Sequence, residues 1–333
     1  MTKLELEQDV IALASKLKLR GNPVNAIVEY CQDNINKWVS NAGGVNDIQH
    51  LEELVASQLN LAFEDVYTDE DLDEIKYRYA QKGEFVFATL KDDLDEDTFG
   101  TMIRLKDGCF VAVIDCRGQQ KFARRFFTRW HEIAHLLVED NNFEKQVFRS
   151  TRDPLERLMD LIAGHVGFYD PLFNPSLEQH YAHGDLLTFD TIEQVRQSYC
   201  SHASFQATLF ACHRRVDAPI LYLEAAMRLR EEERRKQRQK TFLNITPTPK
   251  LRVSTTVPNK AAQNTNLTVR WNMQIPETSV IFLVQSLPDD SELAMKENLE
   301  DWTFSKGGGL APCEVFVQAR KFGDGVLATI QQI

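Results

Sequence analysis

The chain has 333 residues, of which 43% are hydrophobic and 26% charged, and its formal net charge is −11. These values exclude wholesale disorder, and the length exceeds what one hydrophobic core usually serves, so two or three domains are expected. The acidic balance argues against a typical duplex-DNA binder, because neutralising phosphates requires a basic surface.

Neither end of the chain nor its interior predicts a membrane or secreted protein. No apolar run reaches the roughly 18–20 residues that cross a bilayer, and residues 1–7 are charged where a secretory signal would be apolar. The six cysteines form no CxxC pair and are scattered at positions 31, 109, 116, 200, 212 and 313. Free thiols in a reducing compartment are therefore expected, and we expect the protein in the cytoplasm with no membrane partner.

The first third of the chain predicts helices followed by short strands. Residues 4–62 read as helical, with Asn22 as an N-cap before Pro23 and a break at Gly43-Gly44. Further along, apolar runs bounded by turn residues indicate strands. The predicted strands are 63–67, 85–90, 102–105 and 110–115, and a helix is predicted at 69–80.

The rest of the chain predicts a helical region and then a change of character. Helices are predicted at 121–138, 153–168, 189–213 and 218–240. Prolines at 247, 249 and 258 mark a boundary, beyond which short apolar runs such as 280–284 and 315–319 indicate strands. The fold class is therefore α+β, in three parts: an N-terminal helical region at 1–62, a central domain at 63–245, and a small α+β domain at 250–333.

The helix predicted at 121–138 carries the motif His131-Glu132-Ile133-Ala134-His135. Residues i and i+4 share a helix face, so His131 and His135 can bind one metal ion side by side. Glu132 is placed to take a proton from metal-bound water. The pattern predicts a zinc ion (Zn2+) with an open fourth position, as in catalytic zinc sites.

A third ligand is expected from a following helix. Glu156 lies 21 residues beyond His135, and Asp160 follows one turn later, where it can orient a histidine ligand through a hydrogen bond. Glu156 equally fits a helix-start carboxylate favoured by the helix dipole. The spacing leaves other acidic candidates open, namely Glu139, Asp140, Glu144 and Asp170.

Two segments together resemble the ImmA/IrrE family of metallopeptidases. The first runs from Arg125 to Leu137 and contains the HExxH motif, and the second runs from Glu156 to Gly164. The resemblance covers about residues 60–240 and is strongest in 101–170. Two departures concern the substrate cleft: Asp160 stands where members usually have Asn, and Gly167-Phe168-Tyr169 replaces a common Leu-Met-Pro.

The resemblance implies a zincin-like fold for the central domain and Glu156 as the third zinc ligand. It also implies a site-specific endopeptidase that cleaves a helix-turn-helix transcriptional repressor in response to stress or DNA damage. Larger family members add a C-terminal GAF-like sensor, which residues 250–333 would match, and single-stranded DNA is the expected activator. The layout is similar to that of members that accompany anti-phage (CBASS) defence operons.

Several other residues have both a functional and a structural interpretation. Cys109 lies in a turn before the strand that leads to the metal helix, and its thiolate is a hypothetical inhibitory zinc ligand or simply a strand cysteine. A basic stretch at 228–240 is a solvated helix or part of a single-strand surface. Three histidines and two tryptophans complete the set of candidates: His165, His180, His183, Trp271 and Trp302.

Two alternatives to a regulated endopeptidase remain. A peptidase of broad specificity is disfavoured, because unregulated proteolysis in the cytoplasm would be harmful. A non-enzymatic regulator or nucleic-acid sensor with a structural zinc site is disfavoured by Glu132, since a structural site has no need for a general base.

Overall fold

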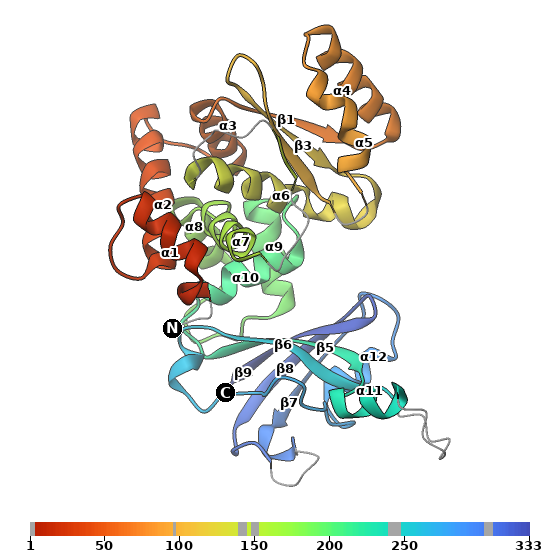
Figure 1. The fold of residues 1–333 in the computed structure, drawn as a ribbon. Helices are drawn as coiled ribbons and strands as arrows, with labels where there is room; N and C mark the ends of the chain where they lie inside the picture. The colour runs from red at the N-terminus through yellow and green to blue at the C-terminus, as the bar shows by residue number, and fades with distance from the viewer. Residues whose placement is uncertain (1–3, 96–97, 139–144, 148–152, 239–247, 303–308) are drawn as a thin grey trace. The chain divides into compact units, whose positions relative to one another are not determined.

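A computed structural model describes residues 4–95, 98–138, 145–147, 153–238, 248–302 and 309–333 (Figure 1). The chain is α+β and divides into two compact units. The first comprises 1–180 and 192–211, and the second comprises 181–191 and 212–333. The chain thus crosses between the units three times. The predicted boundary at 245–250 lies inside the second unit.

The first unit begins with a short 3-10 helix, η1, and three α-helices. Asn22 accepts a hydrogen bond from the Asn25 backbone N–H and Pro23 opens the second helix, as predicted, while Gly43 ends it with a positive φ of 83°. The bounds are η1 Leu4–Leu6, α1 Gln8–Lys16, α2 Pro23–Ala42 and α3 Ile48–Gln58.

A four-stranded mixed sheet follows, in the order β1-β3-β2-β4. β1 is parallel to β3, whereas β2 is antiparallel to both β3 and β4. The strands are β1 Leu61–Val66, β2 Gly100–Arg104, β3 Phe110–Asp115 and β4 Lys145–Val147. Three of them match predicted strands, but the predicted strand at 85–90 is wrong. That segment forms η2 Phe85–Thr89 and leads into α5 Leu90–Asp93, after α4 Asp69–Gln81.

One long helix lies against this sheet, and a second long helix packs on the first. The predicted helices at 121–138 and 153–168 correspond to α6 Gly118–Val138 and α7 Pro154–Val166. α6 packs on β3 and α7, and α7 also packs on α2. At the end of α7 the Tyr199 hydroxyl donates a hydrogen bond to the Gly167 carbonyl at 2.9 Å. A Cβ at Gly167 would lie 2.8 Å from the Trp130 indole, so the close packing of α7 on α6 requires glycine there.

Three further helices complete this stretch of the chain: α8 Asp170–His180, α9 Phe189–Tyr199 and α10 Phe205–Arg215. The single helix predicted at 189–213 is therefore two helices, interrupted at residues 200–204. No helix in the described ranges is long and apolar enough to cross a membrane.

The second unit contains a five-stranded antiparallel sheet in the order β6-β5-β9-β8-β7. The strands are β5 Ile220–Arg228, β6 Lys250–Pro258, β7 Glu292–Asn298, β8 Glu314–Phe322 and β9 Gly325–Gln332. Its helices are α11 Glu231–Arg238, α12 Val280–Gln285, and two 3-10 turns, η3 Ala262–Asn264 and η4 Leu299–Asp301.

Two sequence predictions in this unit are wrong. The helix predicted at 218–240 is strand β5 followed by the short helix α11, because β5 pairs with β6 on one side and β9 on the other. The strand predicted at 280–284 is helix α12, whose start is held by polar partners. The Ser279 hydroxyl accepts the Ile281 N–H, and the Glu297 carboxylate accepts the Val280 N–H at 2.9 Å. The strand predicted at 315–319 is confirmed within β8.

Candidate metal centre

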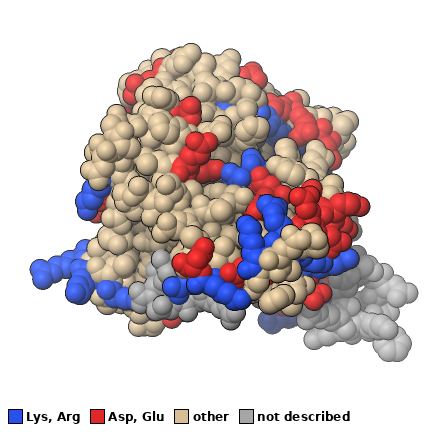
Figure 2. All heavy atoms as spheres, turned by 90° about the horizontal axis from the view of Figure 1, so that it is seen from above, with Lys and Arg blue, Asp and Glu red and all other residues tan. Residues whose placement is uncertain are grey.

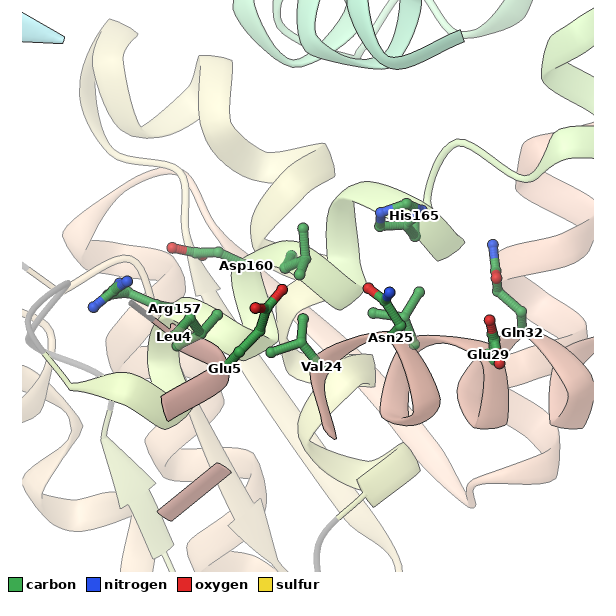
Figure 3. Close-up of a pocket in the computed structure, with 11 residues that line it drawn as sticks. Leu4, Glu5, Val24, Asn25, Glu29, Gln32, Arg157, Asp160 and His165 are labelled. Carbon is green, nitrogen blue, oxygen red and sulfur yellow. The ribbon is translucent and has the colours of Figure 1, made fainter. Parts of the chain in front are cut away.

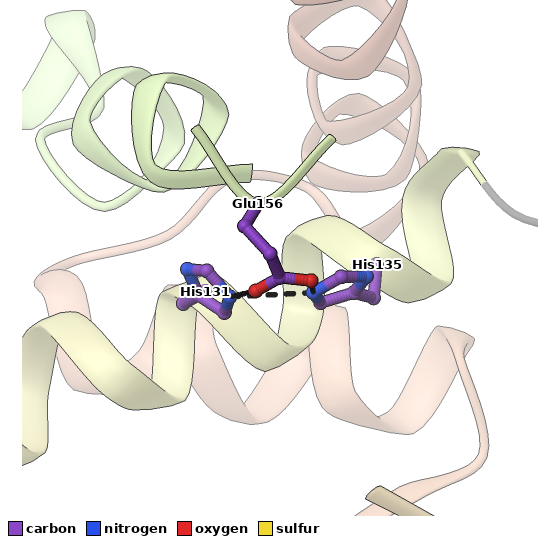
Figure 4. A group of neighbouring side chains, drawn as sticks. All are labelled: His131, His135 and Glu156. Carbon is purple, nitrogen blue, oxygen red and sulfur yellow. Dashed lines mark hydrogen bonds and ion pairs between the residues drawn. The ribbon is translucent and has the colours of Figure 1, made fainter. Parts of the chain in front are cut away.

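Three donor groups from helices α6 and α7 meet at one point. His131 and His135 lie one turn apart on α6, and Glu156, in the first turn of α7, reaches between them (Figure 4). The Nε2 atoms of the two histidines are 3.2 Å apart. The Glu156 carboxylate lies 3.2 Å from His131 Nε2 and 3.6 Å from His135 Nε2. Among the described residues, these three form the group of side chains that can hold a metal ion.

The spacing of these atoms suits a tetrahedral metal site. Bonds of roughly 2.0–2.1 Å at tetrahedral angles place ligand atoms about 3.3 Å apart, and the two histidine nitrogens, at 3.2 Å, are close to that value. The two oxygens of Glu156 face different histidines: Oε2 lies 3.2 Å from His131 Nε2, and Oε1 lies 3.6 Å from His135 Nε2. His135 is fully buried, while His131 and Glu156 keep 12% and 17% of their side chains exposed. A cation there would be approached by solvent from one side.

The side chain of Asp160 fixes the orientation of His131. Its Oδ1 lies 2.9 Å from His131 Nδ1, so Nε2 is left to face the centre. This is the contact that the sequence led us to expect of Asp160. Burial lowers the pKa of His131, but hydrogen bonds to Asp160 and Glu156 outweigh it and raise the pKa to about 10. Without a cation, these carboxylates therefore hold a proton on His131 at neutral pH.

Glu132 lies next to the donor group and is only 1% exposed. Its negative charge contributes to the raised pKa of His131. One carboxylate oxygen, Oε1, lies against the backbone of Gly100 at the start of β2, where an added Cβ would be only 2.8 Å away. Gly100 was missed in the sequence, since a single glycine before a strand carries no signal of a neighbouring carboxylate.

The structure does not bring Cys109 to the centre. Glu132 meets the Gly100 end of the β2–β3 hairpin, while Cys109 lies in the turn at the other end, next to Phe110. The five residues of β2 separate the two ends by about 16 Å. A hydrogen bond with Asp107 and its charge raise the pKa of the Cys109 thiol. The hypothetical inhibitory ligand is therefore too far away, because the hairpin directs it away from the metal helix.

The remaining sequence candidates are also placed outside the donor group. His165, His180, His183 and Asp170 are described and are not members of it. Glu139, Asp140 and Glu144 lie outside the described residues. In the second unit, Trp302 is 1% exposed and its indole N–H donates to Glu297 at 3.1 Å, so it offers no stacking face. Trp271 is 62% exposed.

The N-terminal half of α6 is held by paired charges. Arg125 donates to Asp65 at 2.8 and 2.6 Å, and Arg129 donates to Asp65 and Glu52. Asp115, with a side chain that is fully buried, accepts from Arg117 and Lys121 at 2.8 Å each. These ion pairs fix the metal helix to β1, β3 and α3.

Comparison with the models of known protein families gave no match, and comparison with curated proteins gave none either.

Proposed function

We propose that this chain is a zinc-dependent endopeptidase whose catalytic centre consists of His131, Glu132, His135 and Glu156. The observation that carries the proposal is the convergence of two imidazole nitrogens and one carboxylate with Glu132 adjacent. Two nitrogen donors and one oxygen donor suit zinc, and three protein ligands leave a fourth position for water or substrate, as in catalytic zinc sites.

The residues of the chain divide the work of hydrolysis. When bound, the zinc ion lowers the pKa of a coordinated water to roughly 7. Glu132 accepts a proton from the attacking water and passes it to the departing amine nitrogen of the peptide bond. Because Glu132 is 1% exposed, its charge acts in a weakly screened environment. Asp160 keeps His131 in the tautomer that presents Nε2 to the metal.

Metal analysis tests this assignment. We expect the purified wild-type chain to hold one zinc ion, and His131→Ala and Glu156→Ala to lose it while circular dichroism stays unchanged. Asp170→Ala is the matched control, because that carboxylate lies outside the donor group. Wild-type zinc content in both ligand variants would refute the site.

We further propose that the substrate is a helix-turn-helix transcriptional repressor, cleaved in response to stress or DNA damage, with control of an anti-phage defence operon as one setting. This rests on the ImmA/IrrE resemblance of Arg125–Leu137 and Glu156–Gly164, which also suggests a zincin-like first unit. The test is incubation of the zinc-loaded chain with purified helix-turn-helix repressors. A single cut in the repressor, absent with Glu132→Gln, is the expected result, and an intact repressor would reject this substrate.

The second unit is proposed to be a GAF-like sensor that responds to single-stranded DNA. Its antiparallel sheet is compatible with this, and Trp271 offers an exposed ring with the Arg228 guanidinium 5.6 Å from its centroid. A base can stack on such a ring while arginine meets the phosphate. Figure 2, seen from above, shows one face of the molecule, on which both acidic and basic side chains lie and acidic ones gather in several groups. Trp271→Ala should weaken oligonucleotide binding, and equal binding by both proteins would remove this surface.

A further inference from the structure

A groove in the first unit runs between α7 on one side and α2 with η1 on the other (Figure 3). Its volume is about 650 Å³. Along α2 it extends from Val24 to Gln32, which is about 12 Å of helix and matches roughly three to four residues of extended peptide. The groove is therefore of a size to take a short peptide segment rather than a single small ion.

The groove borders the metal centre through Asp160. This residue lines the groove and also binds His131 Nδ1 at 2.9 Å. A peptide residue in the groove would thus lie one side chain away from a ligand of the metal.

The lining of the groove has an apolar part and an excess of negative charge. Val24, Val28 and Leu161 contribute aliphatic surface. Three carboxylates, of Glu5, Glu29 and Asp160, also line it, although that of Asp160 already contacts His131. Arg157 is the one arginine or lysine in the lining. A lysine or arginine side chain matches this lining, because its methylene stem can cover apolar surface while its cationic head meets carboxylates.

We propose that this groove binds a lysine or arginine residue of the peptide substrate, close to the bond that is cut. The proposal rests on the proposed peptidase function and names the class of substrate side chain it accepts. Glu29 is the residue that best tests it, because it is exposed on α2 and lies outside the metal ligands and Asp160. DNA-binding proteins such as helix-turn-helix repressors are rich in basic residues, so the two proposals are compatible.

Binding is measured first, without cleavage. The zinc-loaded full chain carrying Glu132→Gln is titrated with sets of fluorescent peptides. Within a set, the peptides are identical except at one position, which holds lysine, its uncharged isostere norleucine, or glutamate. Each set places this position at a different point along the peptide. The lysine peptide should bind about tenfold more tightly than the norleucine peptide at one position, and added salt should reduce the difference. Equal affinities for the lysine and norleucine peptides at every position would overturn the proposal.

Charge reversal in the groove then locates the effect. Adding Glu29→Lys should abolish the lysine preference and improve binding of the glutamate peptide. Glu74→Lys, the same change at an exposed position of α4, should leave the preference intact. Loss of the preference in both variants would mean that general charge, not the groove, is responsible, and would also overturn the proposal.

Cleavage by the chain with an intact Glu132 separates this proposal from the peptidase proposal. A lysine preference that depends on Glu29, but with no peptide cut, would support the groove and reject the peptidase. Cleavage of all peptides at equal rates, unchanged by Glu29→Lys, would support the peptidase and reject the groove. A kcat/KM about tenfold higher for the lysine peptide, lost with Glu29→Lys, supports both.

Discussion

The two halves of helix α6 use charged and polar residues in opposite ways. In the N-terminal half, Arg125 and Arg129 meet Asp65 in ion pairs, so the charges compensate each other. In the C-terminal half, His131 and His135 face Glu156, and one donor atom from each residue lies within 4.8 Å of the others. The first arrangement stabilises the fold, whereas the second favours a cation. One helix therefore combines a rigid attachment with a candidate metal centre.

The largest effect is expected from a variant that changes only the proposed chemistry of the C-terminal half of α6. Glu132→Gln should lower peptide cleavage by about 10³-fold, because the amide keeps the shape of the side chain but cannot accept the proton of water. Zinc content and thermal stability should match those of wild type. Cleavage assays beside metal analysis check this, and near wild-type turnover would remove Glu132 as the base.

The second largest effect is expected from a variant that removes the ion pairs of α6 but keeps the metal-ligating residues. Asp65→Ala removes the shared partner of Arg125 and Arg129 at a site where the aspartate is 12% exposed. We expect a loss of about 3 kcal/mol in the free energy of unfolding, measured by urea denaturation. Asp73→Ala is the control: the Asp73 side chain is 72% exposed, so its ion pair with Lys76 is screened by water and its loss should leave stability nearly unchanged. Equal losses of unfolding free energy in the two variants would contradict the view that the partly buried ion pairs of Asp65 stabilise the fold more than an exposed pair does.

A third change addresses the contact between the sheet and Glu132, the proposed general base. Gly100→Ala places a Cβ 2.8 Å from Glu132 Oε1 and 3.2 Å from Thr128 Cγ2. The carboxylate must shift, so cleavage should fall by about tenfold or more while zinc stays bound. The double variant Gly100→Ala with Thr128→Ser relieves only the methyl contact and should not restore activity. Recovery in that variant would assign the effect to Thr128.

The metal centre and the ion pairs at the start of α6 should respond to acid in different pH ranges. Because the metal-free pKa of His131 is raised to about 10, a proton must leave when metal binds. Apparent zinc affinity should fall about tenfold for each pH unit below that value.

Arg117 and Lys121 hold the pKa of Asp115 below its ordinary 3.8, and their effect on this pKa outweighs that of burial. The stability from Asp115 is thus present above pH 3.8 and lost as pH falls through its lowered pKa. Zinc titrations and urea melts across pH measure both.

The centre could be predicted from the sequence because helix geometry fixes the relation of His131 to His135. Glu156 could not be identified as the third ligand from spacing alone, because several other carboxylates remained candidates. Its place depends on how α7 packs on α6, and Gly167 against Trp130 shows that this packing depends on contacts distant in sequence. The same limit applies to Gly100 and to Cys109, whose position follows from the hairpin rather than from closeness in the chain.

The errors in the fold occurred where short apolar runs fit both helix and strand. Residues 220–228 contain leucine, glutamate, alanine and methionine, which favour helix, yet they form β5 between two other strands. Residues 280–284 are a continuous apolar run typical of a buried strand, yet Ser279 and Glu297 start a helix there. In both cases the deciding partner, β9 or Glu297, lies far along the chain.

The three crossings of the chain between its units have a consequence for anyone who wants to dissect the protein. The prolines at 247 and 249 suggest a domain boundary near residue 245. A truncation there would keep β5 but remove both neighbouring strands, β6 and β9, and would expose Leu221 and Leu223. It would also remove Gln331, whose amide bonds both the N–H and the carbonyl of Leu187. No single cut yields two complete pieces, so the first unit alone must be made by removing residues 181–191 and 212–333 and joining residue 180 to residue 192.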